Sequence, residues 1–252
     1  MAQETADTYI PGLLITGTDT GVGKTLITAG LLRILGKMGV PTSVVKAVQT
    51  GCTVAPDGQL VAPDEAVYRL ASPDGNRAVR TRTIHRFQPA CSPHLAAEMA
   101  GASLDLEDLA TAVLREVGDR RFVLVEGAGG ILVPLNRHAT ILDLAQRLGF
   151  PVLLVADNRL GVINHSLLTV RILRHRGLRA AGIVFTETEP RTAENEFIRR
   201  DNPGTVAGHG HIPVLASVPF LPEWNPREET CWSQLDLHLT PLAAWLKEEL
   251  GT

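Results

Sequence analysis

The sequence predicts an α/β fold in which a mostly parallel sheet is flanked by helices on both faces. Three observations favour it. Short apolar segments alternate with longer amphipathic ones, most of the short segments are apolar at every position, and a glycine-rich turn joins the first strand to the first helix. Parallel strands linked by right-handed crossovers bring their carboxyl ends to one edge, where ligands bind. We expect residues 1–252 to form a single domain.

The individual elements follow from periodicity. The apolar runs predict strands at residues 13–16, 42–48, 122–126, 151–156, 180–185 and 213–218. Apolar residues that recur every three or four positions predict helices at 25–38, 105–117, 140–148 and 163–176. Gly177 ends the last of these helices. Residues 186–211 and 223–235 show no clear period, so we expect loops or small helices there.

Composition narrows the classes of partner and compartment. The chain carries 24 basic and 27 acidic residues, a net charge of −3, so we expect no nucleic-acid or membrane partner. No apolar run approaches about 18 residues, and the first residues show no basic segment followed by an apolar one, so neither a membrane span nor a secretory signal is expected. Cys52, Cys91 and Cys231 form no C-x-x-C pair and indicate free thiols in a reducing cytoplasm.

The glycine-rich turn lies in the stretch LLITGTDTGVGKTLITAG, between the first strand and the first helix. The usual phosphate-loop spacing, G-x-x-x-x-G-K-[ST], places a glycine five residues before Gly23, but the available Gly17 is one residue too early. The backbone N–H groups of residues 21–25 are suited to wrap a phosphate. We expect Lys24 to reach its oxygens and the Thr25 hydroxyl to bind Mg²⁺. The alternative is a glycine-rich turn with an incidental lysine.

Two further strands end in charged residues. Lys46, in VKAVQTGC, closes the second strand, from which it can present an ammonium to the phosphate site. The alternative is a solvated lysine at a strand end. Cys52 follows it, but no histidine is placed by sequence to activate a nucleophile, so we favour a bystander thiol.

Glu126, in FVLVEGAGGILVPL, ends the third strand, and Gly127, Gly129 and Gly130 then allow close approach of backbone to a ligand. Phosphoryl-transfer enzymes hold Mg²⁺ with a carboxylate at such a position. The alternative is a structural glutamate.

Five segments in this order, GTDTGVGKT, VKAVQTG, CSPHLAAEMAG, VEGAGGILVPL and RLGVINHSLLT, resemble the dethiobiotin synthetases. These are ATP-dependent enzymes of biotin biosynthesis in the deviant P-loop ATPase group. The resemblance runs from about residue 13 to residue 222. The family's loop is one residue longer than the strict spacing, which accounts for the early glycine.

The resemblance implies a P-loop NTPase fold and a Mg²⁺-ATP-dependent ligase that closes a ring. In the family, CO₂ adds to one amine of 7,8-diaminopelargonic acid as a carbamate, and ATP phosphorylates the carbamate oxygen. The second amine then attacks this carbamic-phosphoric anhydride, which gives dethiobiotin, ADP and phosphate. Such attack is intramolecular, so positioning suffices and no protein nucleophile is needed. The family also implies a homodimer.

The resemblance assigns residues one by one. The catalytic residues are Lys46 and Lys24, and the Mg²⁺ ligands are Thr25, Asp64 and Glu126, with Glu65 an alternative to Asp64. The ATP-binding residues are Thr20, Gly21, Val22, Gly23, Lys24, Thr25, Leu26, Asp64, Glu126, Gly127, Ala128, Gly129, Thr186, Glu187, Pro219, Phe220 and Leu221. The substrate-binding residues are Thr50 and, from the second subunit, Arg159, Gly161, Val162 and Asn164. For Asn164 the alternative is a plain helix N-cap.

The chain departs from the family at two positions. Gly21 stands where many members have an acidic residue, and Thr186 stands where an asparagine reads the nucleotide base. A threonine hydroxyl matches adenine less fully than an amide, so base selectivity is open. Two other functions are alternatives. A cobyrinic acid amide synthetase needs a glutamine-hydrolysing domain for which this chain has no room, and a partitioning ATPase places a lysine where Asp19 stands.

Overall fold

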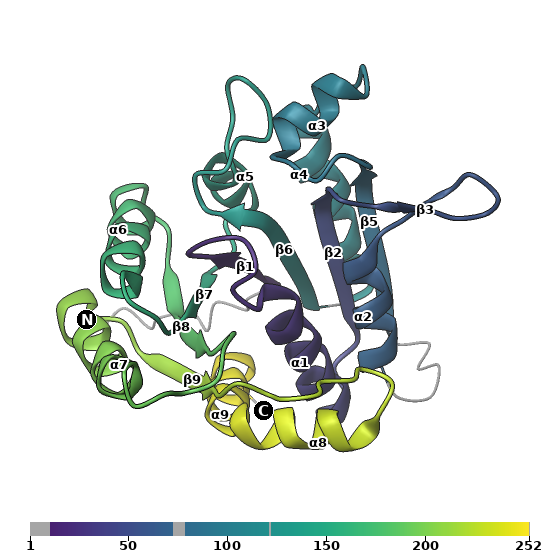
Figure 1. Cartoon of the computed structure of the whole chain (residues 1–252). Helices are drawn as coiled ribbons and strands as arrows, with labels where there is room; N and C mark the ends of the chain where they lie inside the picture. Colours follow the sequence, from purple (N-terminus) through teal and green to yellow (C-terminus); the bar gives the residue numbers. More distant parts are fainter. Residues whose placement is uncertain (1–10, 73–78, 121, 252) are drawn as a thin grey trace, which may run out of the picture.

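The computed structural model describes residues 11–72, 79–120 and 122–251. It confirms the predicted fold class: seven parallel strands form one sheet in the order β5-β2-β6-β1-β7-β8-β9 (Figure 1). Residues 1–10, on which most of the prediction about a secretory signal depends, lie outside the described residues. Within the described ranges, no helix is long and apolar enough to cross a membrane.

The six predicted strands are present and a seventh was missed. The strands of the large sheet are β1 Gly12–Gly17, β2 Thr42–Gln49, β5 Val79–Arg86, β6 Phe122–Gly130, β7 Val152–Asp157, β8 Ala180–Thr186 and β9 Val214–Val218. The missed strand of the large sheet is β5, whose sequence VRTRTIHR carries Arg80, Arg82 and Arg86. It lies at the sheet edge and is only partly buried, so it tolerates these charges. A two-stranded hairpin, β3 Thr53–Val54 and β4 Leu60–Val61, projects beyond β2 (Figure 1).

The four predicted helices are also present. The helices are α1 Lys24–Lys37, α2 Pro63–Ala71, α3 Pro93–Met99, α4 Leu106–Leu114, α5 Ile141–Leu148, α6 Val162–His175, α7 Glu196–Gly210, α8 Glu229–His238 and α9 Thr240–Leu250. The predicted helix at 105–117 becomes a 3₁₀ helix from Arg115 to Arg120. The expectation of loops or small helices at 186–211 was wrong, because α7 is 15 residues long. Pro203 and several glycines hid its period.

Alternate residues of the central strands face opposite layers of helices. In β1, Leu13 and Ile15 pack in one apolar cluster with α1, α8 and α9, whereas Leu14 packs in another with α4 and α5. A third cluster lies between α6, α7 and the strands β7 and β8. Both faces of each central strand are therefore buried, which explains why these segments are apolar at every position.

β1 lies at the middle of the sheet, between β6 and β7. β2 and β5 lie beyond β6 on one side, and β8 and β9 lie beyond β7 on the other. The loop that leaves β1 therefore emerges where the strand order changes direction, at the edge formed by the carboxyl ends of the strands. Ligands of such sheets bind at this position.

Candidate active site

The loop after β1 forms a cradle at the start of α1. Gly21 and Gly23 adopt left-handed backbone conformations, with φ of 78° and 85°. A side chain at position 23 would also come within 3.1 Å of the Thr186 methyl group. No side chain caps α1, and its first turn has no acidic residue. The free N–H groups and the helix dipole therefore favour an anion such as a phosphate.

Lys24 begins α1 and folds back over the loop. Its Nζ donates to the backbone oxygen of Asp19 at 2.7 Å, and the residue is buried. Burial lowers the pKa of the Lys24 ammonium to about 8, although the nearby Glu126 carboxylate opposes the shift. If a phosphate binds in the loop, the Lys24 ammonium can donate to a charged phosphate oxygen in place of the neutral backbone oxygen of Asp19.

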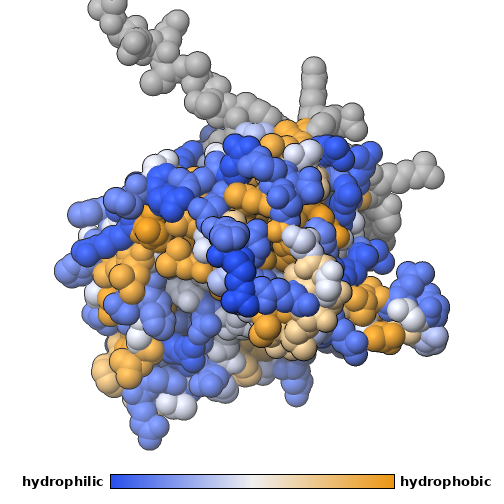
Figure 2. Space-filling model, turned by 90° about the horizontal axis from the view of Figure 1, so that it is seen from above, coloured by the Kyte–Doolittle hydropathy of each residue, from blue (hydrophilic) through white to orange (hydrophobic). Residues whose placement is uncertain are grey.

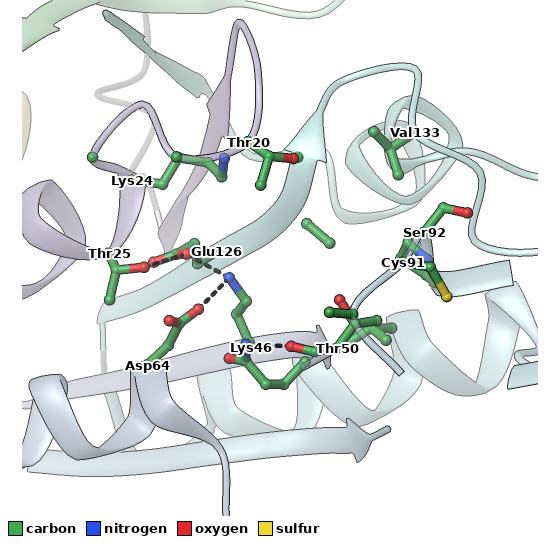
Figure 3. Close-up of a pocket in the computed structure, with 18 residues that line it drawn as sticks. Thr20, Lys24, Thr25, Lys46, Thr50, Asp64, Cys91, Ser92, Glu126 and Val133 are labelled. Atoms are coloured by element: carbon green, nitrogen blue, oxygen red, sulfur yellow. Dashed lines mark hydrogen bonds and ion pairs between the residues drawn. The ribbon is translucent and has the colours of Figure 1, made fainter. Parts of the chain in front are cut away.

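Lys46 is not the solvated lysine of the alternative interpretation, because only 5% of the residue is exposed. Its Nζ lies 2.5 Å from Glu126 Oε1 and 2.7 Å from Asp64 Oδ2 (Figure 3). Burial by itself would lower the pKa of the ammonium, but Glu126 and Asp64 outweigh it and raise the pKa above the ordinary value. Lys46 is therefore a fixed, permanently charged group.

Glu126 is fully buried on β6 and collects donors from three other elements. Oε1 accepts from the Thr25 hydroxyl at 3.1 Å as well as from Lys46, and Oε2 accepts from the Tyr68 hydroxyl at 2.5 Å. Burial would raise the pKa of this carboxyl, but the charge of Lys46 lowers it below the ordinary value. Glu126 is therefore ionised.

These groups line one cavity of about 690 Å³. Lys24, Lys46 and Asp64 lie on one side of it, and Cys91, Ser92 and Val133 lie across from them (Figure 3). The expected site residues that line the cavity are Thr20, Gly21, Gly23, Lys24, Thr25, Lys46, Thr50, Asp64, Glu126, Ala128 and Gly129. Segments far apart in the sequence thus meet around one space, large enough for the reacting ends of a nucleotide and a small substrate.

The neighbouring residues Asp64 and Glu65 face different surroundings. Asp64 points to Lys46 and the cavity. Glu65 instead accepts from Thr83 at 2.9 Å and from Arg86 at 2.7 Å, away from Lys46. The geometry therefore favours Asp64 over Glu65 as a residue of this site.

The segments expected to contact the base lie beside the loop but do not line the cavity. The Thr186 hydroxyl donates to the backbone oxygen of Val22 at 2.8 Å, and the residue is buried. The Glu187 carboxylate is paired with Arg191 and Arg199, and its N–H donates to Val218, immediately before Pro219, Phe220 and Leu221. Of the other expected residues, Val22 and Leu26 pack in the core, and Gly127 presents a backbone oxygen 3.5 Å from Lys46.

The segment Arg159–Asn164 comprises the turn before α6 and the first three residues of that helix, and it does not line the cavity of its own chain. The residue that caps α6 is Gly161, and Asn164 lies within the helix and is exposed, so the N-cap interpretation of Asn164 was wrong. Val162 is buried in the core. The Arg159 side chain is 59% exposed, near Asp19 and Asp157.

Sequence reasoning missed several residues of the site. Gln49, Cys91, Ser92 and Pro93 line the cavity, and Tyr68 holds Glu126 from behind it. The only sequence signal for Tyr68 is its spacing of four residues from Asp64, which places both on one side of a helix. The described residues contain no group of three or more His, Cys, Asp or Glu side chains that could hold a metal by themselves.

Comparisons with known proteins identify the family of this chain. The chain matches the family described as "AAA domain" over residues 11–228. It is 40% identical to the ATP-dependent dethiobiotin synthetase of Pseudomonas paraeruginosa, covering 86% of this chain and 93% of the relative. The corresponding enzyme of Anoxybacillus flavithermus is 37% identical, with 86% and 95% covered, and that of Thermodesulfovibrio yellowstonii is 33% identical, with 85% and 90% covered.

Solved structures with the same fold are more distant in sequence. The septum site-determining protein MinD of Pyrococcus horikoshii, complexed with Mg-ADP, superposes with a TM-score of 0.63 at 17% identity, over 95% of this chain and 97% of that one. The MinC:MinD cell division complex of Aquifex aeolicus gives 0.60 at 14% identity, over 94% and 95%. This likeness shows the P-loop ATPase fold alone. The relatives at 33–40% identity decide the family: the chain belongs to the ATP-dependent dethiobiotin synthetases.

Proposed function

We propose that this ligase joins CO₂ to 7,8-diaminopelargonic acid with MgATP and closes the ureido ring of dethiobiotin. The observation that carries the proposal is the pair of buried lysines, Lys24 and Lys46, that face one cavity from the loop and from β2. A carbamate and a triphosphate repel each other, so bringing them together requires clustered positive charge. The two ammonium groups supply it without a nucleophile.

The roles of the side chains follow from their positions. Lys24 holds the terminal phosphates within the loop and also meets the carbamate, and Thr20 and residues 21–25 line the phosphates. Lys46 holds the carbamate and the phosphoryl group as it moves between the two anions. Thr50, on the same wall as Lys46, contacts the substrate. The second amine then attacks within the bound molecule, so the rate depends on orientation.

The hydroxyl of Thr25 and the carboxylates of Asp64 and Glu126 fit a magnesium ion. All three offer the hard oxygen atoms that Mg²⁺ prefers. A small number of protein ligands is sufficient, because Mg²⁺ keeps several waters and also binds the substrate phosphates. Both carboxylates are already drawn together by Lys46 at the cavity wall. When bound, Mg²⁺ neutralises charge on the phosphates.

Cys52 takes no part in this chemistry. The thiol is buried, and burial raises its pKa, so the reactive thiolate is disfavoured. Cys52, Cys91 and Cys231 are all free, which supports a reducing, cytoplasmic location.

Base recognition depends on Thr186 and its neighbours. Because the Thr186 hydroxyl already donates to Val22, it offers the base less than the family asparagine does, and we infer relaxed use of other nucleoside triphosphates. Turnover with ATP, CTP and GTP tests this. Thr186→Asn should raise the preference for ATP by about ten-fold. A strong ATP preference in the unaltered enzyme contradicts the inference.

A homodimer completes the substrate site. In this proposal the Arg159–Asn164 turn of one subunit binds the carboxylate tail of the substrate held by the other. Leu132 and Leu168, exposed in a pocket beside the loop that follows β1, and the exposed Leu160 of the Arg159–Asn164 segment supply apolar surface for the contact. Figure 2 shows that apolar side chains, in orange, lie exposed among hydrophilic ones when the molecule is seen from above.

Mixing two inactive variants tests the shared site. Lys46→Met and Arg159→Glu chains, refolded together, form mixed dimers in which one of the two sites has neither defect. Random pairing restores roughly a quarter of the wild-type activity. No recovery, with mixed dimers shown to be present, contradicts a shared site.

The reaction itself is tested with purified protein, diaminopelargonate, bicarbonate, Mg²⁺ and ATP. The expected result is a ureido product with one phosphate released for each ring. ATP turnover that proceeds without the diamine and is not stimulated by it contradicts the proposed function.

A further inference from the structure

Tyr68 is a buried phenol whose hydroxyl contacts two groups of the candidate active site, Glu126 and Thr25. It lies on α2 with 1% of its surface exposed, packed in the apolar cluster that includes α1 and β6. Its hydroxyl donates to Glu126 Oε2 at 2.5 Å. Burying a phenol requires a partner for its hydroxyl, but a backbone oxygen would satisfy that requirement equally well. The choice of a fully buried carboxylate indicates an additional role.

The two oxygens of Glu126 are occupied differently. Oε1 faces Thr25 and Lys46, the groups that line the cavity, and Oε2 faces Tyr68. The last torsion of a glutamate side chain is broad, so a carboxylate held at only one oxygen turns readily. The Tyr68 bond holds Oε2 and thereby helps to determine where Oε1 points, and the Thr28 hydroxyl also lies close to this carboxylate. The Tyr68 bond is also a contact that a cation at Oε1 does not displace.

Tyr68 also links Glu126 to Asp64. The two residues are four apart on α2, so they lie on one side of the helix. One turn of α2 thus carries a carboxylate at the cavity and the hydroxyl that holds the carboxylate of β6. The separation between Asp64 and Glu126 therefore depends on this bond.

We propose that Tyr68 is a positioning residue that sets the Glu126 and Asp64 carboxylates in the geometry that binds the divalent cation. This inference rests on the proposed function, which assigns both carboxylates to Mg²⁺. Mutation of a hydrogen-bonding partner behind a metal ligand typically costs about 10–100-fold in metal affinity or activity.

The test compares Tyr68→Phe, which keeps the ring and its packing, with the unaltered enzyme. ADP binding is measured by calorimetry at increasing Mg²⁺ concentrations and without Mg²⁺. The variant should bind ADP without metal within about two-fold of the unaltered enzyme. The Mg²⁺ concentration that gives half of the metal-dependent gain should rise by about ten-fold or more.

Thr83→Val is the matched control. The Thr83 hydroxyl is also buried and also donates to a carboxylate on α2, but that carboxylate is Glu65, which faces away from Lys46. This variant should lose stability and keep the Mg²⁺ dependence of the unaltered enzyme.

If Tyr68→Phe lowers the melting temperature but leaves the Mg²⁺ dependence unchanged, Tyr68 only packs the core and the inference is overturned. If ADP binding by the unaltered enzyme does not respond to Mg²⁺, the assignment of Mg²⁺ to these carboxylates in the proposed function is wrong, and the inference about Tyr68 is overturned with it.

Discussion

Arg33 and Lys46 are both buried cations paired with two carboxylates, yet they lie in different surroundings. Arg33, on α1, contacts Glu229 and Asp236 of α8, and its guanidinium lies 5.3 Å from the centre of the Trp232 ring. It is 3% exposed and lies between two helices. Lys46, 5% exposed, is paired as closely but faces the 690 Å³ cavity.

Burial and pairing therefore do not distinguish a structural cation from one with a proposed catalytic role. Arg33 uses its planar fork to hold α8 against α1. Lys46 is a compact charge whose carboxylate partners are also the proposed metal ligands. The two clusters differ in the open volume beside them. A ligand in the cavity can reach Lys46 and its two carboxylate partners, whereas Arg33 does not line the cavity. Three substitutions test the contrast.

The largest effect is expected for Lys46→Met, which keeps most of the side-chain volume and removes the charge. Formation of the ureido product should fall by roughly 100- to 1000-fold, because the charge that stabilises the transferring phosphoryl group is lost. ADP binding, measured by calorimetry, should change by only a few-fold. Near-normal turnover would place Lys46 with Arg33 as a structural cation.

The next effect is expected for Arg33→Met. Asp236 keeps Lys37 and Glu229 is mostly exposed, so losing the charged hydrogen bonds of Arg33 should reduce the free energy of unfolding by about 2 kcal/mol. Urea unfolding measures this loss. The turnover of the folded fraction should stay within about two-fold, since Arg33 does not line the cavity. A large fall in turnover would show that the contrast between the two clusters is false.

The smallest effect is expected for Glu229→Gln. The Glu229 side chain is 67% exposed, and Arg33 keeps Asp236 as a partner. Solvent screens exposed pairs, so the free energy of unfolding should fall by less than about 1 kcal/mol. A loss as large as that of Arg33→Met would mean that Glu229, and not the cluster as a whole, anchors α8.

The sequence predicted those parts of the fold that depend on local pattern. Central strands such as β6 are apolar on both faces, and helices such as α1 carry a clear apolar stripe. β5 was not predicted because an edge strand tolerates charges. α7 was not predicted because packing against α6 stabilises this helix despite Pro203. Tertiary packing decided both of these elements.

The candidate site divides in the same way. Lys24, Lys46 and Glu126 were identified because each stands at a strand end or a loop with its own motif. Tyr68 was missed because its partner Glu126 lies 58 residues away, and outside the site the Arg33 cluster was missed because Asp236 lies 203 residues away. The hydrogen bond from the Thr186 hydroxyl to Val22 could not be predicted either, since no residue pattern indicates which backbone oxygen accepts from a buried hydroxyl.

The strand order has a consequence for how such an enzyme changes over evolutionary time. Lys24 follows β1, Lys46 lies on β2 and Glu126 lies on β6, which are neighbours on one half of the sheet. The segments proposed to recognise the base and the substrate tail follow β7, β8 and β9, on the other half. Substitutions on that second half can therefore alter which molecules are accepted while the phosphoryl-transfer apparatus stays intact, so new specificities are accessible through single steps that do not abolish activity.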